Sequence, residues 1–343
     1  MARSKENIID IARQAEVSIA TVSRVVNHRP DVSDYLRGKV QEVLAKSNFR
    51  PRVISNRPTH IAIVMEMELP LLEDFWANIL SGISKYAFEQ GVVTSILFFS
   101  SLWAQKVDLL KAIRERRCNA AVLLGPAKLQ RQLDSLAKSG IPTILVAERS
   151  DIPNIGFLDA AGLDGAVSAT EYLISLDHKR IAFLAGSLEM KSDHCNRLAG
   201  YKRAMRAANL EINPDWIISH IPLSPTPSAG YEQTKLALLA DPTITAIIAV
   251  NDSMAYGAIL ACSDLGRRVP DDISIIGFDD YPNSAYSNPP LTTIRQPMLQ
   301  MGYEAAKAAD TMARGIIDAP PRQVFSGELI VRKSTKICRD TLK

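Results

Sequence analysis

The sequence predicts an α/β protein with a small helical head in front of a larger body of parallel sheets. Within Asn7–Asn27, apolar residues recur at helical spacing in two short runs separated by a tight turn. From Ile61 onward, continuous apolar runs alternate with amphipathic segments, as in parallel strands covered on both faces by crossover helices. A chain of 343 residues with 47% hydrophobic content allows two or three domains with sizeable cores.

The N-terminal segment predicts a helix-turn-helix. The apolar stripe of its first helix consists of Ile8, Ile11, Ala12 and Ala15. Ser18 is placed to cap the second helix, whose buried face consists of Val22, Val25 and Val26. The outward face then consists of Ala20, Arg24 and Asn27, with Ser23 at the margin and Ile19 near the exposed start. Small and hydrogen-bonding side chains on a supported helix suit the floor of a DNA major groove, although apolar stripes alone are typical of any small helical unit.

A third helix and a basic linker follow. Ser33 is placed to cap a helix whose apolar positions are Leu36, Val40, Val43 and Leu44. Residues 1–60 hold 11 Lys/Arg and 6 Asp/Glu, whereas the remainder holds 29 and 31. Positive charge gathered in the small N-terminal unit is what attraction to phosphates requires, but many solvated helices carry a similar excess.

The pattern of the body predicts parallel, doubly wound sheets. We expect strands at 61–65, 93–99, 120–124, 143–146, 155–158, 181–185, 217–221, 246–250 and 273–278. We expect helices at 74–90, 104–116, 128–139, 163–176, 197–208, 230–240, 253–265 and 298–314. Ligands of such sheets bind beyond the carboxyl ends of the strands.

Polar residues stand at four of these strand ends. They are Asn251-Asp252, Asp279-Asp280, Glu148-Arg149, and the group Lys191, Ser192, Asp193 and Arg197. Carboxylates accept from pairs of hydroxyls and a guanidinium donates as a fork, so together these groups are able to hold a polyol. Any single one of them is more often an ordinary turn or cap residue.

The string V-S-I-A-T-V-S-R-V-V-N at 17–27, preceded by Asp10-Ile11-Ala12, resembles the helix-turn-helix of the lactose/galactose repressor family. Body segments such as H-K-R-I-A-F-L-A-G and V-P-D-D-I-S-I-I-G-F-D-D resemble that family's effector-binding core, which is similar to periplasmic sugar-binding proteins. The resemblance implies a head at 1–48, a degenerate hinge at 49–60, an N-terminal subdomain at 61–163 plus 294–323, and a C-terminal subdomain at 164–293 plus 324–343. It also implies three crossings between subdomains, near Asp164, Pro290–Gln296 and Gln323.

The resemblance implies site residues as well. In the head, Ile19, Ala20 and Arg24 approach base edges, and the phosphate contacts are Ser18, Thr21, Ser23, Asn27 and His28. In the linker, Arg52 is a candidate phosphate contact and Ile54 a substitute for the family's minor-groove wedge. The expected effector residues are Phe75, Trp76, Arg197, Asn251 and Asp279, to which the strand-end argument adds Glu148, Lys191 and Asp193. The aromatics have core packing as an equal alternative.

Four departures from the family qualify this assignment. Glu16 occupies the turn where Gly is frequent, and an L-residue there costs about 1 kcal/mol if φ is positive. Pro58 falls on the wedge position and disfavours a hinge helix, so we expect weaker DNA bending than in the family. Pro225 replaces a stacking aromatic, and Lys191 and Asp193 differ from the purine-responsive pattern. A sugar is therefore favoured over a purine as effector.

The sequence thus predicts a ligand-responsive transcriptional regulator, with a repressor favoured, that acts as a homodimer on a pseudo-palindromic operator. No cofactor is expected. The four cysteines and five histidines form no metal-ligand motif, and no apolar run reaches the ~18–20 residues of a membrane span or a secretory signal, which predicts a bacterial cytoplasmic protein. The alternatives are a solute-binding protein and a nucleotide-dependent α/β enzyme. Neither G-x-G-x-x-G, G-x-x-x-x-G-K-[ST], H-E-x-x-H nor G-x-S-x-G occurs, so we expect no catalysis.

Overall fold

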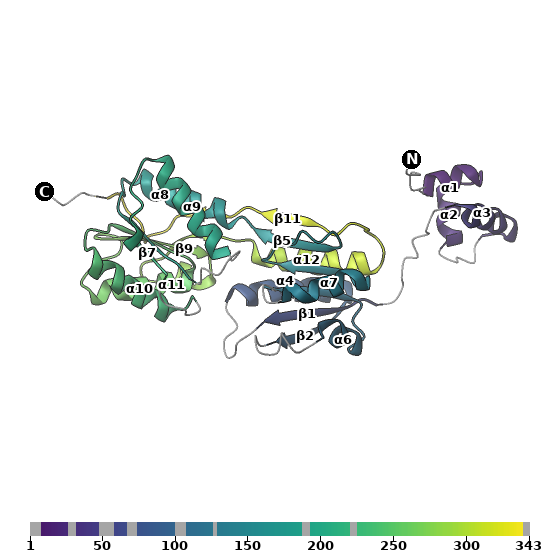
Figure 1. Cartoon of the computed structure of the whole chain (residues 1–343), viewed down its shortest axis with the longest axis horizontal. Coiled ribbons are helices and arrows are strands. Elements are labelled where there is room, and N and C mark those ends of the chain that lie inside the picture. The colour runs from purple at the N-terminus through teal and green to yellow at the C-terminus, as the bar shows by residue number, and fades with distance from the viewer. Residues whose placement is uncertain are drawn as a thin grey trace.

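The computed structural model describes residues 8–26, 32–47, 58–66, 74–99, 108–125, 129–186, 193–219 and 225–338. Three helices form the head: α1 (Ile8–Gln14), α2 (Ile19–Val26) and α3 (Asp34–Lys46). The remaining described residues form two lobes, each built on a six-stranded sheet (Figure 1). Within the described part of the chain, no helix combines the length and the apolar character that crossing a bilayer requires.

The first lobe contains an all-parallel sheet in the order β11-β5-β4-β3-β1-β2. Its strands are β1 (His60–Glu66), β2 (Val93–Phe99), β3 (Ala120–Leu124), β4 (Thr143–Val146), β5 (Ile155–Ala160) and β11 (Arg322–Phe325). Its helices are α4 (Asp74–Gln90), α6 (Leu109–Glu115), α7 (Gln130–Ser139) and α12 (Met298–Ala313). The two faces of the sheet carry separate buried clusters, one under α4 and α12 and the other under α6 and α7.

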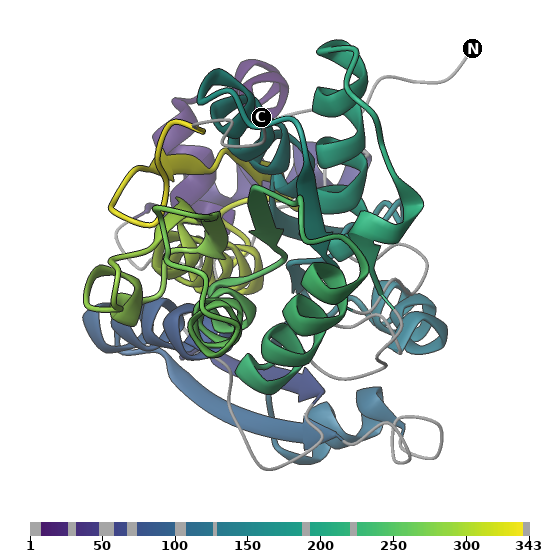
Figure 2. The same ribbon diagram turned by 90° about the vertical axis from the view of Figure 1, so that its left-hand side faces the viewer.

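The second lobe has the sheet order β12-β10-β9-β8-β6-β7, parallel except for β12, which runs antiparallel to β10. Its strands are β6 (Ile181–Leu184), β7 (Ile217–Ile218), β8 (Ala246–Ala249), β9 (Ser274–Asp279), β10 (Thr292–Arg295) and β12 (Glu328–Ile330). Its helices are α8 (Gly162–Ser175), α9 (Asp193–Ala207), α10 (Pro227–Ala240) and α11 (Asp252–Asp264), with short 3-10 turns η2 (Pro214–Trp216) and η3 (Pro282–Ala285). Figure 2, with this lobe in front, shows helices on both sides of its sheet.

The predicted fold class is confirmed, because both sheets are built from apolar strands joined through helices as the alternating pattern indicated. Three strands were not predicted, namely β10, β11 and β12. Their sequences T-T-I-R, R-Q-V-F and E-L-I mix polar and apolar residues, since β11 and β12 lie at sheet edges where water reaches one side. The strand expected at 217–221 is shorter than predicted, ending at Ile218.

The chain passes between the lobes three times. The first passage lies at Ala161, between β5 and α8, and the second lies between β10 and α12. The third lies between β11 and β12. The predicted boundaries at 294 and 324 were therefore two residues early, because Ile294 and Arg295 pair within the second sheet while Val324 and Phe325 pair within the first. The first passage lies close to Asp164, near which a crossing was predicted, although the predicted boundary at 164 is slightly late.

The head packs as its periodicity predicted. The buried residues are Ile11, Ala12, Ala15, Val22, Val25, Val26, Val32 and Val40. Glu16 follows α1 with a φ of 52°, and the amides of Glu16 and Val17 donate to the carbonyls of Arg13 and Ala12 at 3.2 and 3.0 Å. This pair of bonds is the Schellman ending of a helix, a position that favours glycine. The side chain of Glu16 projects outward and binds Lys39 at 2.8 Å.

We expect Glu16→Gly to stabilise the head. The substitution removes backbone strain of about 1 kcal/mol, while the exposed ion pair that it sacrifices contributes little. Hydrogen exchange of the α1–α3 amides in the full chain measures this as slower exchange. Lys39→Gln is the matched control, because it removes the same ion pair without changing the turn. Faster exchange in Glu16→Gly than in Lys39→Gln would contradict the strain argument.

Candidate DNA-reading helix and effector site

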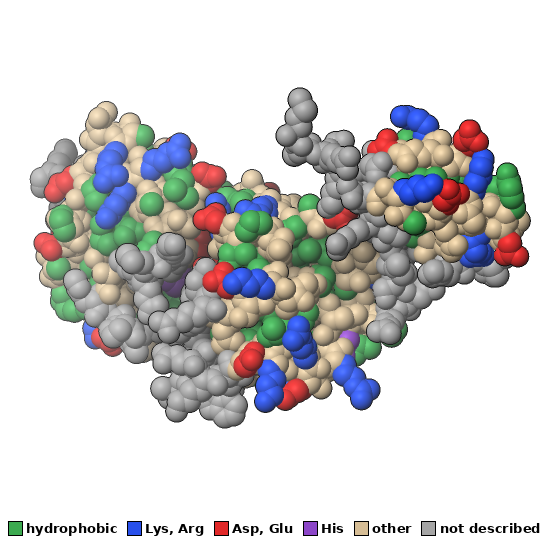
Figure 3. All heavy atoms as spheres, turned by 45° about the vertical axis from the view of Figure 1, so that its right-hand side comes forward, with side chains coloured by type: hydrophobic (Ala, Val, Ile, Leu, Met, Phe, Trp, Pro, Cys, Tyr) green, Lys and Arg blue, Asp and Glu red, His purple; other side chains and the backbone are tan. Residues whose placement is uncertain are grey.

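Helix α2 buries one face in the head and exposes the opposite face to solvent. Val22, Val25 and Val26 are buried against the other helices of the head, whereas Ala20 and Arg24 are exposed and Ile19 retains 48% of its surface. This is the orientation that the periodicity predicted. Figure 3 shows the head at the upper right with charged side chains of both signs on the visible surface. The outward face of α2 is therefore available to a flat polar partner such as a groove floor.

The start of α2 is fixed by its own hydroxyl groups. The Oγ atom of Ser18 accepts the backbone N–H of Thr21 at 3.0 Å and lies 2.9 Å from the Thr21 hydroxyl. The predicted N-cap is confirmed. Both hydroxyls remain at the helix N-terminus, where phosphate oxygens are favourable partners. The side chain of Ser23, together with Asn27, His28, Arg52 and Ile54, lies outside the described residues.

In the second lobe, three of the predicted effector residues form one buried cluster. Arg197 lies on α9, and its Nη2 atom is 2.6 Å from Asp193, one turn earlier, and 3.4 Å from Asp279 at the end of β9. Its Nη1 group donates to the carbonyl of Val250, just beyond β8. The guanidinium lies over the Phe278 ring, 3.8 Å from the ring centre. The carboxyl ends of β8 and β9 thus meet the start of α9 at a single cation.

The backbone after β9 is held in an uncommon conformation. Asp279 and Asp280 have φ values of 112° and 58°, which L-residues rarely adopt. The turn directs the Asp279 carboxylate toward Arg197, while Asp280 pairs with Arg332 and Arg295 at 2.7 Å each. Such strain persists only where surrounding contacts impose it, and it is frequent at ligand sites.

Electrostatics within the cluster favour a charged Arg197. Burial lowers its pKa, but the charges of Asp193 and Asp279 outweigh that effect and raise the pKa above its ordinary value. Burial raises the pKa of Asp279 despite the neighbouring guanidinium. Asp193, which is closer, is therefore the principal counter-ion of Arg197.

Asp252, the first residue of α11, is a buried carboxyl next to this cluster. It accepts the N–H of Tyr281 at 2.8 Å and the hydroxyls of Ser284 and Thr293 at 2.5 Å each. Burial, assisted by the charge of Asp279, raises the pKa of Asp252 to about 7. A side chain added at Gly277 would meet its Oδ1 atom at 2.2 Å, so the strand approaches this carboxyl closely.

The raised pKa of Asp252 predicts a pH dependence of stability. An unfolded Asp has a pKa of about 4, so between pH 4 and about 7 the folded state binds the proton more tightly than the unfolded state does. The contribution of Asp252 to the free energy of unfolding is therefore fully present below pH 4, falls as the pH rises to about 7, and is level above. We expect Asp252→Asn to flatten this slope in urea titrations at pH 5 and pH 8, because the amide is able to replace the protonated carboxyl. An unchanged slope would show that other groups cause it.

Asn251 behaves as the cap residue that strand-end asparagines usually are. Its Oδ1 atom accepts the N–H of Met254 at 2.9 Å, and its Nδ2 group donates to the carbonyl of Pro225 at 3.0 Å. The side chain is buried, with 4% of its surface exposed. Asn251 therefore lies beside the Arg197 cluster, but both of its polar side-chain atoms form hydrogen bonds within the protein. Its assignment to the effector remains a prediction.

The aromatic pair of the first lobe lies at the start of α4. Phe75 and Trp76 are half-buried, with ring centres 4.8 Å apart and nearly perpendicular planes. Both pack against the apolar cluster under α4, and the Trp76 ring lies over Gly125 at the end of β3. Core packing is thus part of their role. Glu148 is half-buried beyond β4, and Lys191 lies outside the described residues.

Sequence reasoning missed two residues that lie beside the candidate site. Asp159, near the end of β5, accepts from Arg149 at 2.6 Å, and the charge of Asp193 from the other lobe contributes to its raised pKa, of which burial is the main cause. Gln296, in the second passage between lobes, donates to Asp279 at 2.5 Å. The signal for Asp159 was present, since it follows an apolar strand as Asp279 does. Gln296 carries no local signal, because only the crossing places it beside Asp279.

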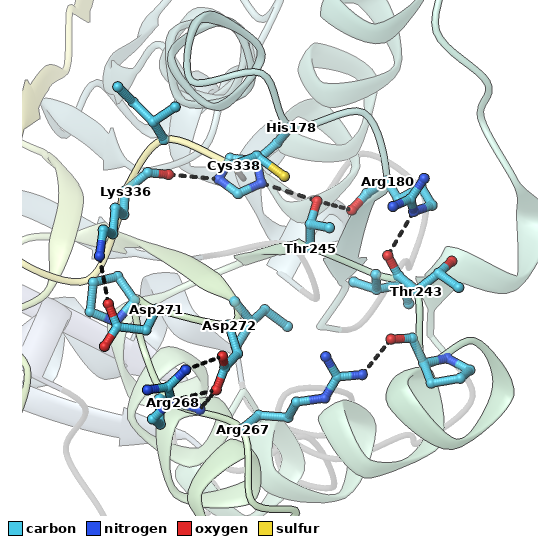
Figure 4. Close-up of a pocket in the computed structure, with 15 residues that line it drawn as sticks. His178, Arg180, Thr243, Thr245, Arg267, Arg268, Asp271, Asp272, Lys336 and Cys338 are labelled. Atoms are coloured by element: carbon cyan, nitrogen blue, oxygen red, sulfur yellow. Dashed lines mark hydrogen bonds and ion pairs between the residues drawn. The ribbon is translucent and has the colours of Figure 1, made fainter. Parts of the chain in front are cut away.

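A separate cavity of about 650 Å³ lies at the other end of the strands of the second sheet, next to the amino ends of β6, β8 and β9 (Figure 4). Its charged side chains already have partners within the fold. Arg268 pairs with Asp272 and Lys336 with Asp271, each at 2.7 Å, and Arg267 donates to the carbonyl of Pro242. Since parallel sheets bind ligands at the carboxyl ends of their strands, this cavity is not the predicted effector position.

A helix-turn-helix head joined to a two-lobed, periplasmic-binding-protein-like body defines a ligand-responsive DNA-binding regulator. Residues 7–52 match the family described as "Bacterial regulatory proteins, lacI family", and residues 170–335 match a "Periplasmic binding protein-like domain". The chain belongs to the lacI family of bacterial regulatory proteins, as the helix-turn-helix string predicted.

Relatives extend this likeness over nearly the whole chain. Catabolite control protein A of Priestia megaterium is 30% identical over 342 residues, which cover 96% of this chain and 99% of that protein. Among solved structures, the transcriptional regulator CelR–cellobiose complex superposes with a TM-score of 0.71 at 27% identity, covering 96% of this chain and all of that one. The lac repressor dimer bound to operator and the anti-inducer ONPF gives 0.72 at 25% identity, covering 97% of this chain and all of that one.

Proposed function

We propose that this regulator is a homodimeric repressor whose operator affinity is controlled by a sugar or sugar derivative bound between the two lobes. The observation that carries the proposal is the buried cluster of Asp193, Arg197 and Asp279 at the carboxyl ends of the second sheet. Clustered carboxylates that a buried guanidinium holds in place suit the hydroxyls of a polyol. CelR, a structural neighbour, was solved with cellobiose, which supports a sugar as the class of effector.

The head supplies the DNA-binding part of the proposal. Ile19, Ala20 and Arg24 face outward from α2, where Ile19 and Ala20 are suited to thymine methyl groups and Arg24 to guanine. Two heads on a dimer read two half-sites of a palindrome, and the lac repressor is a dimer in its operator complex. Phosphate contacts are proposed for Ser18, Thr21, Ser23, Asn27, His28 and Arg52, with Ile54 as the wedge.

A titration of the full chain with duplex DNA tests the function. Fluorescence anisotropy on operators selected from random sequence, at low and moderate salt, gives the affinity with and without each sugar of a panel. We expect a palindromic preference and a sugar that changes operator affinity, because ligand and DNA binding are linked reciprocally through the lobes. A chain that ignores duplex DNA at low salt in every ligand state excludes the proposal.

We also infer that the chain catalyses no reaction, which rests on its relatives being transcriptional regulators. The two rival functions are distinguished by this titration together with direct measurements of ligand binding and of ligand turnover. A solute-binding protein retains sugar binding without any DNA response, and a nucleotide-dependent enzyme turns over its ligand. We propose that the two lobes correspond to the predicted subdomains, with the boundaries corrected to the three passages between the sheets.

A further inference from the structure

The guanidinium of Arg197 is already neutralised and almost fully engaged by the protein. Its Nε and Nη2 atoms donate to the same carboxylate oxygen of Asp193 at 2.8 and 2.6 Å, and its Nη1 group donates to Val250. Only 5% of the residue is exposed, and Phe278 covers one face of the group. A cation in this state offers an arriving anion little hydrogen-bonding capacity and little uncompensated charge.

The capacity that remains in the site belongs to acceptors. The Oδ1 atom of Asp193 is buried and has no hydrogen-bond partner among the described residues. It lies against Gly162, where the chain first passes between the lobes, so close that a Cβ added there would meet it at 2.1 Å. A carboxylate oxygen only accepts hydrogen bonds, so its natural ligand partner is a hydroxyl or an amine.

Acidic side chains from both lobes lie close enough here for the charge of Asp193 to contribute to the raised pKa of Asp159. Asp193 belongs to the second lobe and Asp159 to the first, and each has one arginine partner, Arg197 and Arg149 respectively. Asp279 adds a third carboxyl that no further arginine balances within the cluster, since Arg197 serves both acids of its lobe. A phosphate or carboxylate placed here would meet acceptors and like charge. A hydroxyl would meet acceptors that it is able to satisfy.

We propose that Asp193 selects the charge of the effector, admitting uncharged polyhydroxylated ligands and rejecting phosphorylated or carboxylated ones. The inference rests on the proposed function, because it assumes that the sugar binds at this cluster. Asp193 acts directly, as an acceptor for a ligand hydroxyl. It also acts through Arg197, because it neutralises the positive charge that would otherwise attract an anionic ligand.

Calorimetry and thermal shift of the full chain test this selectivity with matched sugars. The panel pairs neutral aldoses and cellobiose with 6-phosphates and uronic acids of the same rings. We expect the wild type to bind a neutral member about tenfold or more tightly than its charged counterpart. Asp193→Asn keeps the shape but frees Arg197 from its closest counter-ion, so this preference shrinks or reverses. Asp215→Asn, an exposed acid of the same lobe, is the charge-matched control and leaves the preference unchanged.

The outcomes separate the two levels of the proposal. Equal or tighter binding of a phosphorylated or carboxylated sugar by the wild type overturns the selectivity but retains a sugar effector. An unchanged neutral-to-charged ratio in Asp193→Asn also overturns it, provided the melting temperature without ligand shows a folded protein. Asp193→Ser serves as a second variant if the asparagine form does not fold. Binding of neither class by a chain that still holds operator DNA rejects the sugar effector and the inference with it.

Discussion

Arg197→Leu is expected to abolish the effector response and to lower the free energy of unfolding by about 3–5 kcal/mol at neutral pH. The substitution leaves the carboxylate of Asp279 buried, with only 3% of its surface exposed, and removes its cation. Asp193 loses the same partner but retains some contact with water, as 24% of its side chain is exposed. Leucine is shorter than arginine and leaves open the face of Phe278 that the guanidinium covers, so lost packing contributes to the effect.

The pH dependence of that loss identifies its cause. If unpaired carboxylates are responsible, protonating them restores part of the stability, and the deficit in urea titrations is smaller at pH 5 than at pH 8. Arg268→Ala is the matched control in the same lobe, since Arg268 holds Asp272 with two bonds of 2.9 and 2.7 Å in an exposed ion pair. It should change stability little, because water solvates both groups. Equal losses in the two variants would mean that burial of the pair is irrelevant.

Arg24→Ala is expected to relax the operator preference at one base pair of each half-site, by about 1–3 kcal/mol of discrimination. Arg24 is exposed in the last turn of α2 and is the residue on the outward face best suited to bidentate hydrogen bonds with guanine. Competition between the selected operator and its single-base variants measures the change. The affinity for the preferred sequence falls while affinities for the variants converge on it.

Lys46→Ala provides the comparison for Arg24. It removes one positive charge from α3 of the same head, where Lys46 pairs with Glu42 on its own helix. We expect a small, uniform weakening across all operator sequences from that change. If Arg24→Ala also weakens every sequence equally, Arg24 contacts phosphate and the base-reading role passes to shape recognition by Ile19 and Ala20.

The sequence predicted the fold well where local rules decide it. Alternating apolar runs located nine of the twelve strands found in the described segments, with β2, β3 and β4 at the bounds observed. Periodicity placed Val22, Val25 and Val26 in the core of the head. The positive φ of Glu16 had been considered only as a condition, because the resembling family often has glycine at this position. The edge strands β11 and β12 were not predicted, because short, partly exposed strands show only a weak hydrophobic pattern. The start of α9 was placed four residues late, since Asp193 reads as a turn residue until its pairing with Arg197 is seen.

Local sequence rules also located part of the candidate site, namely the residues that follow strand ends. Arg197, Asp193 and Asp279 converge as strand-end residues should, but convergence across lobes depends on which segments cross. Asp159 and Gln296 belong to the site through β5 and the second passage, and no window of sequence shows that relation. Asn251 was selected as a possible ligand contact because it follows a strand. That rule cannot distinguish a helix cap, which Asn251 is, from a ligand contact.

The bond between Gln296 and Asp279 joins a proposed effector residue to one of the segments that link the two lobes. A rotation of one lobe about these linking segments would have its pivot close to the Asp279 carboxylate, so a ligand bound there would act near that pivot. The opposite ends of the sheets lie far from that pivot and travel furthest for the same rotation. A ligand small enough to be enclosed can in this way change the separation of two distant domains without touching either of them.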